Sequence, residues 1–253
     1  MRRLKVMMFV LLIAAQFSVV FGQQTKLMIW KGDSITTSVL TTDIDSVTFE
    51  TEYKKDLGNG IYLINGHRFV DLGLPSGLLW AETNIGAETA TDYGTLFRWG
   101  EAEEISTYMP YKYKGTSGYT KYTKEDGKTI LDNTDDAAWV NWGSYCRMPS
   151  YDDFEELLLA AYTKKEVTTL TDSLGSTIYG LQITGRSNGN SIFFPCKQSD
   201  KSGKCWQSSV YEWNSYQYAK SFSIYCDHSS TKYDYSTNCP RVDGLPVRAV
   251  AEK

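Results

Sequence analysis

Five aromatic residues fall within thirteen positions near the end of the chain: Trp206, Tyr211, Trp213, Tyr216 and Tyr218. Aromatic rings stack on protein side chains and on the apolar faces of sugars. Trp206 and Tyr218 lie within expected strands, so we expect both to point partly into the core. Tyr211, Trp213 and Tyr216 belong to the connection between those strands and are the candidate ligand-binding residues. The alternative for this trio is local packing within the loop.

Cysteines are the second group of residues in this sequence that could carry chemistry. The chain has five cysteines, which leaves at least one thiol unpaired. We expect Cys146 to be free and buried, as a small hydrophobe. Among the other four, Cys226 with Cys239 is the favoured disulfide, and Cys196 with Cys205 is the second. Either bond would close a loop of roughly ten residues and stabilise the fold by about 2–3 kcal/mol on the chain-entropy argument.

Catalytic and metal-binding patterns are missing from the sequence. Asp152, Glu155 and Glu156 form an acidic cluster, but they fall on the polar side of an expected helix and are interpreted as a solvated face. The sequence holds no Cys-x-x-Cys spacing and only two histidines, His67 and His228. We therefore predict no catalytic residue, no metal and no cofactor.

The N-terminus has the pattern of a secretory signal peptide over residues 1–22. Three basic residues precede an apolar run from Val6 to Ala15, and Val20 and Gly22 are small enough for a cleavage site. The apolar run is short for a bilayer span, which needs about 20 residues. Cleavage would leave 23 basic and 30 acidic residues, a net charge of −7. An acidic chain argues against nucleic acid as a partner.

Residues 23–59 are expected to form a small β-segment and a linker. Leu27–Trp30 and Ser34–Leu40 are predicted strands around a turn, and residues 50–59 are predicted to be the linker. An isolated hairpin is marginal in water, so residues 26–49 are expected to pack on the main domain or to pair with a partner's strand.

Residues 60–253 are expected to form the main domain, an α+β fold with short, mostly antiparallel strands, two helices and long loops. Asn65-Gly66 between two apolar runs predicts a tight hairpin. A short helix is predicted around 135–141, capped by Asn133 or Thr134. A second helix is predicted to start at Ser150, with Asp153 completing a capping box.

Dispersed motifs in this region occur in one order and spacing: residues 70–81 (VDLGLPSGLLWA), 97–101 (FRWGE), 135–138 (DDAA), 141–143 (NWG), 147–150 (RMPS), 189–195 (GNSIFFP) and 244–250 (GLPVRAV). Together they resemble the Fibrobacter succinogenes major paralogous domain family. This resemblance implies a C-type-lectin-like fold, distantly similar to that of formylglycine-generating enzymes. It also implies core positions for Trp80, Trp99 and Trp142, and a ligand face on the loops between late strands.

The expected function is that of an exported, non-enzymatic binding or adhesion module at the bacterial cell surface, in the periplasm or outside the cell. Its ligand is expected to be a glycan or a protein. Two alternatives stay open: a structural subunit of a surface appendage that pairs strands through residues 26–49, and an enzyme of the formylglycine-generating type. An enzyme of that type needs two reactive cysteines near its C-terminus, and Cys226 and Cys239 lie in that region.

Overall fold

The computed structural model describes residues 26–31, 34–43, 53–105, 119–211, 217–227 and 230–253. The chain divides into two compact units, the first ending at residue 51 and the second starting at residue 52. The predicted signal peptide lies outside the described residues. In the first unit, β1 (Lys26–Lys31) and β2 (Ser34–Leu40) pair antiparallel and are followed by a 3-10 turn, η1 (Thr41–Asp43). Both predicted strands of this segment are confirmed.

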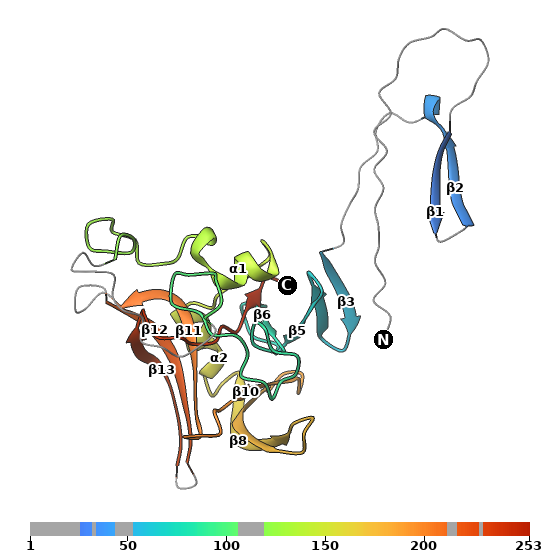
Figure 1. The fold of residues 1–253 in the computed structure, drawn as a ribbon. Coiled ribbons are helices and arrows are strands. Elements are labelled where there is room, and N and C mark those ends of the chain that lie inside the picture. Colours follow the sequence, from blue (N-terminus) through green and yellow to red (C-terminus); the bar gives the residue numbers. More distant parts are fainter. Residues whose placement is uncertain (1–25, 32–33, 44–52, 106–118, 212–216, 228–229) are drawn as a thin grey trace. The chain divides into compact units, whose positions relative to one another are not determined.

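The second unit holds three antiparallel sheets and two short α-helices, so the α+β class is confirmed (Figure 1). Its elements in chain order are β3 (Lys54–Gly58), β4 (Ile61–Ile64), β5 (His67–Asp71), β6 (Leu79–Ala81), η2 (Asn133–Asp135), α1 (Ala137–Trp142), β7 (Cys146–Arg147), α2 (Tyr151–Leu158), β8 (Thr163–Thr171), β9 (Thr177–Gly185), β10 (Ser191–Pro195), β11 (Ser202–Tyr211), β12 (Tyr218–Asp227), β13 (Ser230–Pro240) and β14 (Val250–Ala251).

The largest sheet has six strands in the order β3-β4-β5-β6-β14-β7. Its β4–β5 hairpin turns at Asn65 and Gly66, whose φ angles of 48° and 87° fit the predicted tight turn. Near the middle of the sheet, β14 from the end of the chain pairs with β6. The predicted linker is wrong in part: residues 54–58 form β3, an edge strand that pairs with β4.

The other two sheets have three strands each, in the orders β10-β9-β8 and β11-β12-β13. Long strands make up the second of these, shown in orange to red in Figure 1. Strands β8 and β13 were not expected from the sequence. At Phe97 the structure has an isolated bridge to Leu245 and not a longer strand.

Both helices start at side-chain caps. Ser150 caps α2: its hydroxyl accepts from the backbone N–H of Asp153, and the Asp153 carboxylate accepts from the N–H of Ser150. This capping box is confirmed. The cap of α1 is Asp136, which corrects the expected cap at Asn133 or Thr134. In the described part of the chain, no helix has the length and apolar character to cross a membrane.

Two clusters of buried side chains fill the second unit, and Trp80, Trp99 and Trp142 all lie in them as expected. One arginine, Arg248, satisfies buried carbonyls in this core. The fully buried guanidinium of Arg248 donates to the carbonyls of Ala81, Glu82 and Phe193. Arg147, on the edge strand β7, is half-buried; it pairs with the carboxylate of Asp153 and also donates to the carbonyl of Met148 at 3.3 Å.

Candidate functional site

The predicted aromatic ligand site is only partly described. Tyr211 ends β11, is half-buried and lies opposite Tyr218 on β12. Trp213 and Tyr216 lie outside the described residues. Trp206 is fully buried, and its indole N–H donates to the carbonyl of Phe97 at 2.7 Å, so its expected core position is confirmed.

The structure contradicts both predicted disulfides. On β12 and β13, Cys226 lies opposite Thr231 and Cys239 lies opposite Ala219. Residues 219 and 226 are seven positions apart on one strand, which separates the two sulfurs by roughly 20 Å. The second predicted pair is also wrong.

Cys196 is directed at Cys226, with 2.6 Å between the two Sγ atoms, and not at Cys205. Cys205 is free and buried within β11. Cys146 is free and fully buried, as expected.

The acidic cluster on α2 has separate structural partners. Glu156 accepts from the backbone N–H and the hydroxyl of Ser76, and Glu155 accepts from the hydroxyl of Tyr235. Glu155 and Glu156 therefore accept hydrogen bonds from two different segments and do not converge on one point. Within the described ranges, no group of three His, Cys, Asp or Glu side chains is placed to hold a metal ion.

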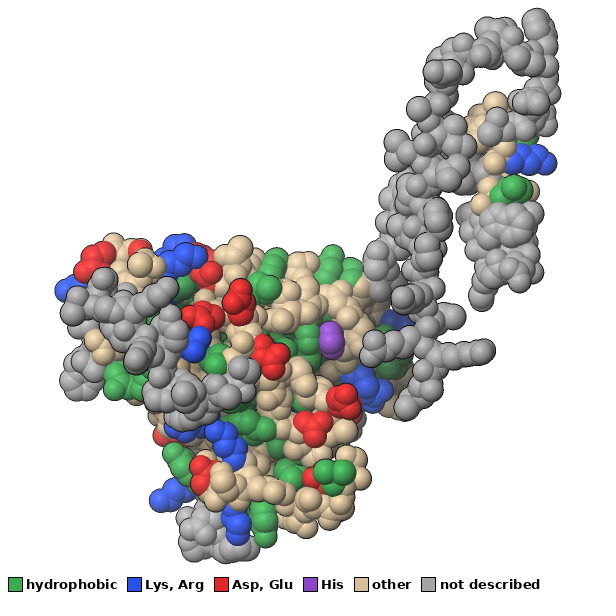
Figure 2. All heavy atoms as spheres, in the orientation of Figure 1, with side chains coloured by type: hydrophobic (Ala, Val, Ile, Leu, Met, Phe, Trp, Pro, Cys, Tyr) green, Lys and Arg blue, Asp and Glu red, His purple; other side chains and the backbone are tan. Residues whose placement is uncertain are grey.

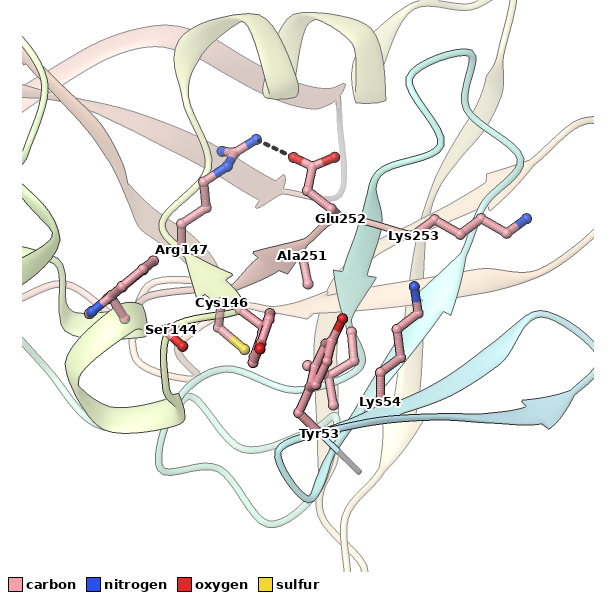
Figure 3. A pocket seen from close by; sticks show the side chains of 11 residues that line it. Tyr53, Lys54, Ser144, Cys146, Arg147, Ala251, Glu252 and Lys253 are labelled. Atoms are coloured by element: carbon pink, nitrogen blue, oxygen red, sulfur yellow. Dashed lines mark ion pairs between the residues drawn. The ribbon is translucent and has the colours of Figure 1, made fainter. Parts of the chain in front are cut away.

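A pocket of about 290 Å³ opens where the two edge strands of the six-stranded sheet, β3 and β7, approach one another (Figure 3). Tyr53 precedes β3 and Tyr145 precedes β7. Their rings stack with centroids 3.4 Å apart and planes 8° from parallel. Both rings stay partly exposed, at 39% and 48%. We call this the aromatic pocket; its lining includes Tyr53, Lys54, Tyr145, Arg147, Glu252 and Lys253.

Charged side chains form the rim of the aromatic pocket. Arg147 donates to the two oxygens of Asp153 at 2.6 and 3.2 Å and lies 3.9 Å from Glu252, as drawn in Figure 3. Lys253 pairs with Asp71 at 2.8 Å. Burial raises the pKa of Asp153, but hydrogen bonds from Arg147 and Ser150 outweigh burial and lower the pKa below its ordinary value. The Arg147–Asp153 pair is therefore fully charged at neutral pH.

The end of α1 fixes the position of Tyr145. The amide of Asn65 in the β4–β5 turn donates to the carbonyl of Trp142 at 2.7 Å. Gly143 follows with a φ of 94°, and a Cβ there would lie 2.6 Å from the Asn65 amide nitrogen. His67 stacks on Trp142 with centroids 3.9 Å apart. These contacts tie the segment before β7 to the hairpin that pairs with β3.

Sequence reasoning missed this pocket because Tyr53 lies in the segment interpreted as a linker. The available signal was one aromatic residue, Tyr53, among polar residues shortly before the β4–β5 hairpin. That signal is weak, since Lys54–Gly58 carries four polar or glycine residues in five positions. Tyr145 is isolated from Tyr53 by more than ninety residues in the sequence.

A second, more polar hollow of about 440 Å³ lies beside the β11-β12-β13 sheet. We call it the polar cleft; its lining includes Tyr93, Lys197, Asp200, Lys204, Tyr225 and Asp243. The Tyr93 hydroxyl accepts from the backbone N–H of Lys204 at 3.0 Å, and the Lys204 ammonium lies 3.2 Å from the Cys239 sulfur. Burial raises the pKa of Asp243. Basic and acidic side chains both line this cleft.

Comparisons with family models, with curated proteins and with solved structures gave no match. The resemblance to the major paralogous domain family therefore rests on the sequence motifs alone.

Proposed function

We propose that this chain is an exported, non-enzymatic binding module of the cell surface, with a C-type-lectin-like fold of the major paralogous domain type, and that the aromatic pocket holds a saccharide. The observation that carries the proposal is the stacked pair Tyr53 and Tyr145 beside Arg147 and Glu252. Ligand pockets combine an apolar surface with a few convergent polar groups, and this pocket has both.

Each part of the pocket suits one part of a sugar. The exposed tyrosine rings offer flat apolar surface to the C–H faces of a pyranose. The planar guanidinium of Arg147 and the carboxylate of Glu252 offer donors and acceptors for hydroxyl groups. Three of the four charged lining residues are basic, so a sugar carrying a carboxylate is also accommodated.

The surface pattern agrees with a binding role of this kind. On the drawn face of residues 52–253, acidic, basic and apolar side chains are interspersed (Figure 2). Proteins that bind nucleic acid usually gather basic residues in one patch or stripe. The drawn face therefore argues against nucleic acid and leaves glycan and protein as the two ligand classes.

The test is a glycan array, with neutral and acidic saccharides, probed with the mature chain. We expect Tyr145→Ala to weaken binding at least about tenfold, equivalent to about 1.4 kcal/mol. Tyr225→Ala is the matched control, because Tyr225 is 43% exposed and lines the polar cleft. Trp213→Ala tests the alternative site predicted from the sequence, which comprises Tyr211, Trp213 and Tyr216.

Three results would overturn the proposal. They are wild-type protein that binds no saccharide, Tyr145→Ala protein that binds like wild type, and loss of binding only in Tyr225→Ala or Trp213→Ala.

One observation favours a structural subunit as a second candidate. Among the described residues, β1 and β2 pair only with one another. Two-stranded hairpins are marginal alone, and their free edges accept a further strand. Deletion of residues 26–49 should then abolish assembly with a partner while glycan binding persists.

The enzyme alternative would place its reactive pair at Cys226 and Cys239. The β12–β13 register puts Cys226 opposite Thr231 and Cys239 opposite Ala219.

A further inference from the structure

Cys196 follows β10 directly, and Cys226 lies near the end of β12. Their sulfurs are 2.6 Å apart, compared with about 2.05 Å in a disulfide bond. Both side chains are buried, at 3% and 2% exposure, so no solvent separates them. The two residues belong to different sheets, since β10 pairs with β9 and β12 pairs with β11 and β13.

Gly203 makes this approach possible. It lies on β11 opposite Ile224, beside the chain at Cys196. A Cβ at this position would lie 2.8 Å from the carbonyl oxygen of Pro195 and 3.6 Å from the Cys196 sulfur. Backbone hydrogen bonds fix both sides of the contact: Lys197 donates to Ser202, and Cys226 donates to Lys201.

The other three cysteines have separate surroundings. Cys146 lies on β7 in the other core cluster, and burial raises its pKa to about 12. Cys239 lies beside the ammonium of Lys204 and the hydroxyl of Ser221. Cys205 is fully buried opposite Phe222, where burial raises its pKa to about 12.

We infer that Cys196 and Cys226 form a disulfide bond that joins the β8–β10 sheet to the β11–β13 sheet. Neighbours of both cysteines, Lys197 and Tyr225, line the polar cleft. The bond therefore also fixes two walls of that cleft relative to one another.

Formation of the bond requires an oxidant. The oxidant is another disulfide, carried by a small molecule or by a protein. The hydrogen bond between the sulfurs raises the pKa of Cys196 and lowers that of Cys226, so the Cys226 thiolate attacks one sulfur of the oxidant. This gives a mixed disulfide and releases one thiolate, which takes the proton of Cys196. Cys196 then attacks the Cys226 sulfur and expels the second thiolate, which is protonated in turn. Two electrons pass from the cysteine pair to the oxidant.

Peptide mapping after refolding in a glutathione redox buffer tests the bond directly. Trypsin places each cysteine on its own peptide: 129–147, 187–197, 205–220, 221–232 and 233–241. We expect peptide 187–197 to be linked to 221–232, and three of the five thiols to react after denaturation. Five reactive thiols after denaturation of the oxidant-treated chain would overturn the inference, as would a link between any other two peptides.

Thermal unfolding supplies a second readout. Reduction should lower the midpoint of the wild-type protein by on the order of 5–10 °C, because the bond closes a loop of about thirty residues. Cys205→Ser is the matched control and should keep this response, whereas Cys196→Ser should lose it. An equal response in Cys196→Ser would contradict the bond. If that variant does not fold, the wild-type peptide map still decides. The mapping is independent of any saccharide, so its failure is distinct from failure of the proposed function.

Discussion

The carboxylate of Asp136 accepts from the backbone N–H of Met148 at 2.8 Å, across twelve residues of chain. Its other oxygen accepts from the N–H of Ala138 and Trp139 and caps α1. One buried side chain therefore holds the start of α1 against the segment that leads from β7 to α2, on either side of Tyr145.

Replacement of Asp136 with alanine should destabilise the protein by about 2–4 kcal/mol, because it removes the helix cap and leaves the Met148 N–H unpaired. Asp136→Asn should cost less, since the amide keeps one acceptor oxygen. Urea denaturation of both variants measures the difference. A cost below about 0.5 kcal/mol for Asp136→Ala would show that the contacts contribute little.

The Arg147–Asp153 pair should make stability depend on acid pH. The pKa of Asp153 is lower in the folded protein than its ordinary value of 3.8, so the folded state binds fewer protons than the unfolded state. Stability from the pair is present above about pH 3.8 and is lost as pH falls through the folded pKa. Asp153→Asn should cost about 1–2 kcal/mol at pH 6 and much less at pH 2. A difference that stays constant across this range would contradict the linkage.

Protonation of His67 should make stability depend on pH in a higher range than protonation of Asp153 does. Burial against Trp142 lowers the pKa of His67 below 6.5 in the folded protein. The unfolded state then binds the proton more readily, so stability declines as pH falls below 6.5 toward the folded pKa. His67→Phe keeps an aromatic ring on Trp142 but cannot titrate. Between pH 8 and pH 5, the thermal midpoint of the wild-type protein should therefore fall relative to that of His67→Phe, and only toward the acid end.

Stacking between Tyr53 and Tyr145 should be measurable without any ligand. A double-mutant cycle with alanine at each position should give a coupling energy of about 0.5–1.5 kcal/mol. Additive effects of the two substitutions would show that the rings do not stack in solution. Tyr225→Ala paired with Tyr53→Ala provides the uncoupled comparison.

Gly143→Ala should cost more than Gly66→Ala, although both glycines have positive φ. A Cβ at Gly66 meets nothing within 4 Å, so that variant shows only the backbone cost, about 1 kcal/mol. At Gly143 the Cβ also displaces the Asn65 amide from the carbonyl of Trp142. In an Asn65→Ala background, the two glycine variants should become similar. If the difference persists in that background, it does not arise from the contact between Gly143 and Asn65.

Local signals in the sequence were reliable where they depend on a few adjacent residues. The Asn65-Gly66 turn needs positive φ at both positions, and the Ser150–Asp153 capping box needs only two side chains. Both were predicted correctly. The buried tryptophans followed from apolar surroundings and from the family resemblance.

Features that depend on distant residues escaped the sequence analysis. Strand β8 alternates polar and charged residues on an edge, and β13 is polar with tyrosines, so neither shows the apolar run of a central strand. The Cys196–Cys226 contact requires two sheets to pack together, and spacing along the chain favours shorter loops. Asp136 was missed as the cap because Asn133 and Thr134 are equally good caps by residue type.

The pairing of β14 with β6 has a consequence for the order of events during synthesis. Val250 lies between Trp80 and Arg147, near the middle of the largest sheet. A growing chain that has reached residue 240 therefore lacks the strand that joins β6 to β7. The sheet cannot be completed until Val250 and Ala251 have left the ribosome, so the unit must fold after its translation.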